Sequence, residues 1–158
     1  MDDGSILDRV AALGLPFPAP PASVASYLPC LVEGSTAYVA GQIPMVDGAV
    51  VNPGIVGDRV SLDEATDGAR RAVLQALSAL REGLGGSLDR LERIVKVQVF
   101  VAAVPAFVDH PKVANGASDL LVEVLGDAGR HARAAVGVTS LPLGAPVEVV
   151  VTAAVRPA

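Results

Sequence analysis

The amino-acid sequence predicts an α+β domain in which two helices pack against one sheet. Strand-like and helix-like segments follow one another along the 158-residue chain in the order β-β-(β)-α-β-α-β-β. One of the helices carries a capping sequence and a regular apolar face, and the last strand is apolar on both of its faces. A sheet that buries one face against helices is a layered α+β arrangement. Because 158 residues is a typical length for a single domain, we treat residues 1–158 as one domain.

The first 26 residues predict a helix followed by an extended arm. Apolar and charged residues alternate over residues 6–13, and the chain is then held extended by Pro16, Pro18, Pro20 and Pro21. Residues 30–40 are typical of a β-hairpin with its turn at residues 33–35. A second hairpin is expected over residues 46–51, because Asp47-Gly48 suits a tight turn with positive φ.

The clearest helix begins at Ser61. Glu64 lies three residues further on, and the two residues together form a capping box. Apolar residues then recur at helical spacing until the helix ends at the glycines Gly83, Gly85 and Gly86. A second helical region is expected after Pro105 and should stop at Gly126.

Three further strands are expected, at residues 94–101, 133–139 and 147–155. The last two are joined by a turn rich in proline and glycine at residues 141–146. The final strand is apolar on both faces apart from Glu148, and such a strand is normally covered on both sides. Two helices can cover only one side, so the sequence predicts that the other side contacts another subunit.

The composition argues against several classes of protein. The net charge of −5 gives no basic surface suited to nucleic acid, so we expect no nucleic-acid partner. No apolar run is long enough to span a bilayer, and the acidic start does not resemble a signal peptide, so we expect no membrane partner. The only cysteine, Cys30, cannot form an intrachain disulfide and is interpreted as a packed apolar side chain. These features predict a cytoplasmic protein.

Two charged residues near the C-terminus are candidates for chemistry. Arg133 stands where a strand begins, and its planar guanidinium could bind a carboxylate through two hydrogen bonds or be a simple surface charge. Glu148 is either paired within a buried environment or lies at an edge that reaches solvent. If the two strands formed a hairpin, its register would decide whether these side chains share a face, and spacing alone does not show that they meet.

Other candidate residues give weaker signals. Asn115 is a poor residue for the middle of a helix, so it lies either near a cap or in a polar pocket. Tyr27 could pack with its hydroxyl group in water. The two histidines, His110 and His131, lack the spacing of a zinc site, and the chain has no CxxC, phosphate-binding loop or nucleophile elbow.

Several short segments, in a fixed order, resemble one known family. They are Tyr27, residues 38–44, residues 95–101, Asn115, residues 132–136, and Leu141-Pro142 leading to residues 147–149. The chain resembles the RidA/YjgF family of reactive-intermediate deaminases, whose members are also described as endoribonuclease L-PSP-like. It looks most like a longer branch with the signatures Asn115-Gly116-Ala117-Ser118-Asp119 and Gly129-Arg130-His131-Ala132-Arg133.

The resemblance implies a chorismate-mutase-like α+β fold with a mixed sheet and two helices on one face. It also implies a homotrimer whose sheets form a central barrel, with ligand clefts between subunits. In such a cleft Arg133 would bind the substrate carboxylate, Glu148 would place or activate water, and Tyr27 and Asn115 would line the walls. Two further cleft positions depart from the family, because Ala40 replaces a frequent serine and Ala135 replaces a frequent cysteine.

The family hydrolyses imines and enamines such as 2-aminoacrylate to 2-oxo acids and ammonia, without a metal or an organic cofactor. The expected function is therefore that of a homotrimeric deaminase (a hydrolase) that acts on a small carboxylate-bearing metabolite. A non-catalytic module that binds or senses small carboxylates is the alternative, because Ala40 and Ala135 remove polar groups from the expected cleft. A ribonuclease is disfavoured by the acidic isoelectric point of about 4.9.

Overall fold

The computed structural model describes residues 2–22 and 26–157. Within these residues the helices are α1 (Asp3–Ala12), α2 (Leu62–Gly83) and α3 (His110–Leu125), with 3-10 turns at Gly126–Gly129 and Pro142–Gly144. The strands are β1 (Cys30–Glu33), β2 (Thr36–Gln42), β3 (Met45–Val46), β4 (Ala49–Val50), β5 (Leu91–Ala102), β6 (Ala132–Val138) and β7 (Val147–Val155). The predicted α+β class is confirmed.

The main sheet is mixed and has the order β1-β2-β7-β5-β6, while β3 and β4 form a separate small hairpin. β5 and β6 run parallel, and the other neighbouring strands in the main sheet are antiparallel. The expectation that residues 133–139 and 147–155 could pair as a hairpin is wrong, because β5 lies between β6 and β7. The turn at residues 141–146 instead carries the chain across β5, which leaves β7 in the middle of the sheet with a hydrogen-bonded neighbour on each side.

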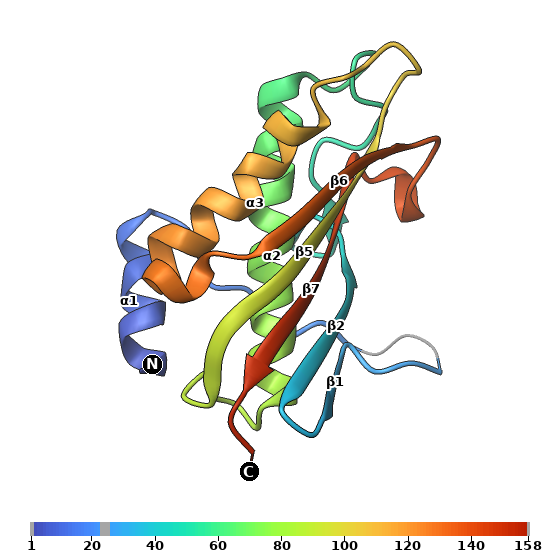
Figure 1. Ribbon diagram of the computed structural model, residues 1–158. Coiled ribbons are helices and arrows are strands. Elements are labelled where there is room, and N and C mark those ends of the chain that lie inside the picture. The colour runs from blue at the N-terminus through green and yellow to red at the C-terminus, as the bar shows by residue number, and fades with distance from the viewer. Residues whose placement is uncertain (1, 23–25, 158) are drawn as a thin grey trace.

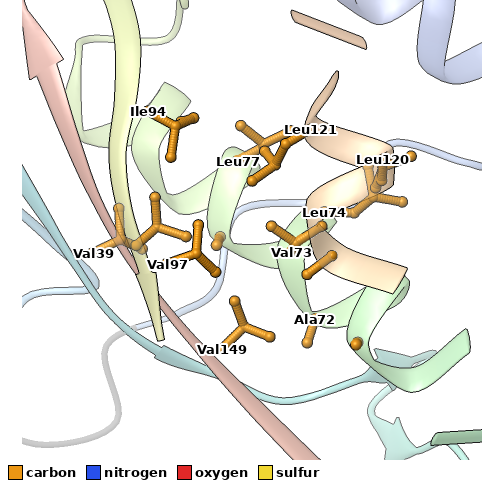
Figure 2. Packing of buried hydrophobic residues seen from close by; sticks show 14 of the residues in the cluster. Val39, Ala72, Val73, Leu74, Leu77, Ile94, Val97, Leu120, Leu121 and Val149 are labelled. Atoms are coloured by element: carbon orange, nitrogen blue, oxygen red, sulfur yellow. The ribbon is translucent and has the colours of Figure 1, made fainter. Parts of the chain in front are cut away.

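The helices α2 and α3 lie on one face of the sheet, and α1 packs beside α3 (Figure 1). Figure 2 shows the core between the layers, where helix side chains such as Leu77 and Val73 lie opposite Ile94, Val97 and Val149 of the sheet. The helices approach closely at Gly116 of α3, where any side chain would overlap the carbonyl group of Thr66 in α2. This close packing fixes the position of α3 over the sheet.

The two helices predicted to cover the sheet both form, but α3 begins later than expected. The capping box of α2 is confirmed, since the Glu64 amide donates to Ser61 Oγ over 3.2 Å and the Ser61 amide donates to Glu64 Oε2 over 2.8 Å. Helix α3 begins at His110 and not directly after Pro105. Pro111 stands in its first turn, where the missing amide hydrogen costs least.

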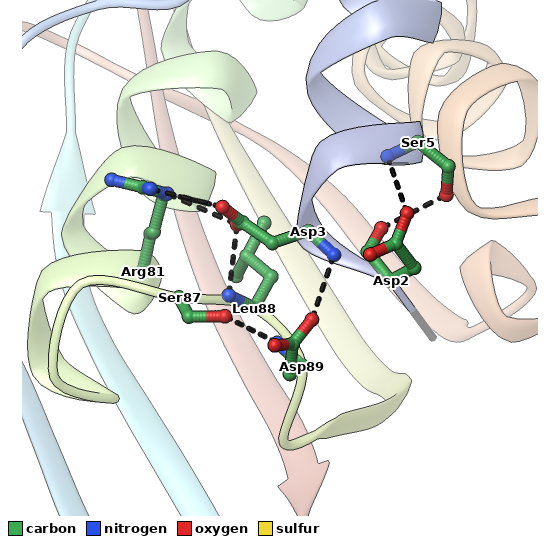
Figure 3. A network of polar contacts seen from close by, with 7 residues as sticks. All are labelled: Asp2, Asp3, Ser5, Arg81, Ser87, Leu88 and Asp89. Atoms are coloured by element: carbon green, nitrogen blue, oxygen red, sulfur yellow. Dashed lines mark hydrogen bonds and ion pairs between the residues drawn. The ribbon is translucent and has the colours of Figure 1, made fainter.

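The helix α1 is tied to the end of α2 by polar contacts (Figure 3). The Asp3 carboxylate accepts hydrogen bonds from Arg81 at 2.9–3.2 Å and from the Leu88 amide at 2.9 Å. Arg9 adds a hydrogen bond of 3.0 Å to the Val124 carbonyl at the end of α3. The helix begins at Asp3, three residues before the predicted helix, and is capped where the Asp2 carboxylate accepts a hydrogen bond of 2.9 Å from the Ser5 amide.

The face of the sheet opposite the helices is open in the single chain. Alternate residues of β7, from Val147 to Val155, are buried against the helices, whereas those between them are half-buried. Leu31, Tyr38 and Val136 are 49%, 51% and 45% exposed, which leaves considerable apolar surface in contact with solvent. Among the described residues, no helix combines the length and the apolar character that crossing a membrane requires.

Candidate functional site

Glu148 lies on the open face of the sheet, directly over Gly41. It is paired with Phe100 of β5, and both residues point away from the helices. On its other side, strand β2 contains a bulge between Val39 and Gln42. A side chain at Gly41 would overlap the Glu148 carboxylate, so the glycine makes room for this carboxylate against the backbone of β2.

The environment of Glu148 suits a general base. Burial raises the pKa of its carboxyl group above the ordinary value of 4.5. None of the hydrogen bonds or ion pairs found within the described part of the chain involves this carboxylate, so both oxygens can accept protons or water. A base whose pKa moves toward neutrality is better matched to proton transfer near pH 7.

Glu148 also lines a cavity of about 1000 Å³. Tyr27, Gly41 and Gln42 contribute to the same cavity, as do prolines of the extended arm and Leu143 of the turn before β7. The arm is held in place where Ser78 of α2 donates a hydrogen bond of 2.8 Å to the Pro18 carbonyl. The arm and β2 therefore form walls beside the glutamate.

Arg133 lies on the other face of the sheet, beside α3. It is paired with Val97, whose side chain is buried under the helices. Its Nη1 donates to Asn115 Oδ1 over 2.9 Å and to Ser118 Oγ over 3.1 Å. Both alternatives for Asn115 are wrong, because it lies inside α3, away from either cap, and its exposed side chain contacts Arg133 instead of lying in a pocket.

A second pair of residues extends this arrangement. Ser118 Oγ lies 3.0 Å from His131 Nε2, and His131 Nδ1 lies 2.6 Å from the Gly129 carbonyl oxygen. Ser118 and His131 are both partly buried, whereas Arg133 itself is exposed. The guanidinium is thus presented at the surface but anchored from beneath.

The six predicted site residues fall into two groups. Arg133, Asn115 and Ala135 lie together on the helix side of the sheet, at its β6 edge. Glu148, on the open side, shares with Tyr27 a cavity that also extends to Leu74 and Gln75 of α2, and Ala40 precedes Gly41 in the bulge of β2. Because a sheet separates the groups, one chain cannot bring the arginine and the glutamate to the same small ligand.

The sequence contained signals for two further polar residues in this region. Ser118 follows Asn115 by three residues, which places both on one face of a helix. His131 precedes Arg133 by two residues, which is the spacing of one face of a strand. The role of Gly41 had no such signal, because it depends on the bulge in β2 and on the neighbouring strand β7.

Comparison with known proteins gives a consistent result. Residues 7–155 match the family described as "YjgF/chorismate_mutase-like, putative endoribonuclease". Protein TCP17 of Trypanosoma cruzi is 41% identical over 147 residues, which cover 92% of this chain and 91% of that protein.

Two solved structures have closely similar folds. One is Atu1372 of Agrobacterium tumefaciens, described as a protein of unknown function, with a TM-score of 0.91, 37% identity, and coverage of 98% of this chain and 94% of that one. The other is described as a putative endoribonuclease of Shewanella oneidensis, with a TM-score of 0.89, 31% identity, and coverage of 95% and 99%.

Proposed function

Because the chain belongs to the YjgF/chorismate-mutase-like family, we propose that it hydrolyses small imino and enamino acids to 2-oxo acids and ammonia. The reaction would take place in a cleft between two copies of the chain, with no metal or organic cofactor. Two features of the structure support the proposal. An arginine is anchored on one face of the sheet, and a glutamate of raised pKa lies on the other face.

Arg133 is suited to binding the substrate carboxylate. Its Nη1 is held by Asn115 and Ser118, whereas its Nε and Nη2 have no hydrogen-bond partner among the described residues. These two nitrogens form the flat edge that donates two parallel hydrogen bonds to a carboxylate. Replacement of Arg133 by Lys would keep the charge but lose this geometry.

Glu148 is suited to activating the water that attacks the imine. In the proposed reaction the carboxylate takes a proton from water as its oxygen forms a bond to the imine carbon. Glu148 returns this proton to nitrogen, which gives the carbinolamine R–C(OH)(NH₂)–COO⁻. The carboxylate then takes the hydroxyl proton and delivers it to nitrogen as the C–N bond breaks, which releases ammonia and leaves a C=O group in place of C=N. The overall change is R–C(=NH)–COO⁻ plus H₂O to R–C(=O)–COO⁻ plus NH₃.

The assembly that we propose is a homotrimer, in which the open face of each sheet meets a neighbour. The exposed apolar side chains of this face, Leu31, Tyr38 and Val136, support an interface there. The β6 edge of one chain, with Arg133, would then approach Glu148 of the next. The single half-buried cysteine, Cys30, is compatible with a reducing compartment, and we propose a cytoplasmic location.

A second candidate function is binding of small carboxylates without turnover. Ala135 follows Arg133 on the same face of β6 and offers only a methyl group, and Ala40 does the same beside Gly41. A cleft with these alanines keeps the carboxylate-binding arginine but has fewer groups with which to orient a reacting nitrogen.

The two functions are separated by following the loss of an imine that an amino-acid oxidase generates and semicarbazide traps. The protein should remove the imine faster than buffer alone, and Glu148→Gln should lower turnover about 100-fold with little change in binding of pyruvate. Arg133→Ala should lose both turnover and pyruvate binding. Glu92→Gln, which changes an exposed glutamate on β5, is the matched control and should behave as the parent.

If the parent binds pyruvate but does not accelerate imine loss, the protein is a carboxylate-binding module. If neither the parent nor Arg133→Ala binds pyruvate, both candidate functions are wrong.

A further inference from the structure

We infer that Ser118 and His131 are positioning residues, and that His131 acts through the Ser118 hydroxyl to hold the guanidinium of Arg133 ready for a carboxylate. The inference deepens the proposed function and rests on it for the identity of the ligand. The hydrogen-bond chain itself runs from the Gly129 carbonyl through His131 and Ser118 to Arg133.

The Gly129 carbonyl determines the direction of this chain. A carbonyl oxygen can only accept, so His131 Nδ1, at 2.6 Å, must carry a hydrogen. In a neutral imidazole the other nitrogen then has a free lone pair, so His131 Nε2 accepts the hydroxyl hydrogen of Ser118 across 3.0 Å.

The hydroxyl of Ser118 is thereby turned so that its oxygen lone pairs face Arg133. A hydroxyl that donates its own hydrogen becomes a stronger acceptor, because hydrogen bonds in a chain polarise one another. It accepts one Nη1 hydrogen of Arg133 at 3.1 Å, and Asn115 Oδ1 accepts at 2.9 Å. An Nη1 group has two hydrogens, so the two partners together occupy both.

This anchoring restricts the conformations of the exposed Arg133 side chain. Arg133 is exposed on the edge strand β6, and a long exposed side chain has many rotamers, most of which do not present its flat edge. Two acceptors one turn apart on α3 restrict those rotamers and leave the Nε and Nη2 edge unoccupied. Affinity for a carboxylate then requires less ordering of the arginine at the moment of binding.

The first test reads the tautomer of His131 directly. Nitrogen-15 NMR spectra of the imidazole rings are recorded at a pH where both histidines are neutral, and His110→Gln assigns the remaining ring to His131. The expected result is a hydrogen on Nδ1 and a bare Nε2. A hydrogen on Nε2 instead would mean that Ser118 does not donate to this ring, and the inference would be wrong.

The second test measures pyruvate binding by titration. Ser118→Ala and His131→Phe should each weaken binding about fivefold, the typical effect of one lost hydrogen bond. His131→Gln should stay within about twofold of the parent, because the amide oxygen of glutamine can accept the Ser118 hydrogen. Ser87→Ala removes a hydroxyl that accepts a hydrogen bond from the Asp89 amide, away from Arg133; it is the control and should bind as the parent.

The double variant Ser118→Ala with His131→Phe should bind no more weakly than Ser118→Ala alone, since the histidine acts only through the serine. Additive losses would overturn the proposed route. Thermal unfolding of each variant, and nitrogen-15 relaxation of the Arg133 Nε–H group, accompany the titrations. The arginine should be ordered in the parent and more mobile in Ser118→Ala and His131→Phe.

The failures can be told apart. A parent that binds no pyruvate contradicts the proposed function, while the tautomer and the Arg133 mobility still decide the inference. If the parent binds pyruvate and a folded His131→Phe variant binds it equally well, the inference is wrong but the proposed function stands.

Discussion

At the scale of single residues, Gly41 determines where the glutamate can lie. The Glu148 carboxylate occupies the space that any side chain at position 41 would need. A glycine is needed here because a side chain of β7 comes close to the backbone of β2. The backbone angle does not require it, since Gly41 does not have a positive φ. The site therefore depends on a residue that has no functional group.

We expect Gly41→Ala to fold and to lose activity. The atoms in the way belong to the end of a flexible glutamate side chain, so the carboxylate can rotate away at a cost of about 1 kcal/mol in stability. Turnover of a trapped imine should fall about tenfold or more, because the base no longer faces the water. Gly4→Ala, at the start of α1 and away from the site, serves as control.

An unchanged turnover in Gly41→Ala would contradict the placement of Glu148 that the proposed mechanism uses.

The sequence suggested individual candidate residues but not how the fold groups them. Arg133 and Glu148 could be identified as candidates from the sequence alone, because one is a charge at the start of a predicted strand and the other is a carboxylate among valines. Their placement on opposite faces depends on β5 inserting between β6 and β7, and pairing between distant strands leaves no local signal. The hydrogen bonds of Arg133 to α3 depend on the same long-range packing.

Among the helices and strands, boundaries were predicted correctly where short-range interactions determine them. The capping box fixed the start of α2, and the Asp47-Gly48 turn between β3 and β4 is confirmed with positive φ at both residues. The start of α1 has a local signal that was missed, since the Asp2 carboxylate caps the helix by accepting from the Ser5 amide. Asp3 is held in addition by Arg81 and Leu88, which lie far along the chain. Contacts of this kind are decided by the tertiary structure alone.

The tether of α1 should make stability depend on acid pH. The hydrogen bond from Arg81, together with that from the Leu88 amide, lowers the pKa of Asp3 below its ordinary value of 3.8. A carboxyl group with a lowered folded-state pKa stabilises the protein above that ordinary value. This contribution is lost as the pH falls through the lowered pKa of the folded state.

Asp3→Asn should therefore reduce the free energy of unfolding at pH 7 by about 1 kcal/mol, after allowance for solvent around Arg81. The difference from the parent should shrink as the pH approaches 3 in urea unfolding experiments. Asp8→Asn, an exposed aspartate on the same helix, should show neither effect. A difference that is independent of pH would mean that the Asp3 charge is not what holds α1.

At the scale of the whole molecule, the open face of the sheet predicts self-association. Light scattering at micromolar concentration should give a mass of three times the 16.0-kDa chain. Val136→Glu places a charge on the open face and should shift the protein toward monomer. Val108→Glu, at a side chain that is 77% exposed before α3, is the matched control and should leave the mass unchanged.

A parent protein that remains monomeric at this concentration would contradict both the trimer and the shared cleft.

The separation of Arg133 and Glu148 by a sheet has a genetic consequence. If each reaction centre takes its arginine from one chain and its glutamate from the next, two different defective chains can supply each other's missing group. Mixed trimers of Arg133→Ala and Glu148→Gln chains, refolded together in equal amounts, should regain intact centres at about one in four positions. Each variant protein by itself should stay inactive, so activity in the mixture would show that the reaction centre is formed by residues of two neighbouring chains.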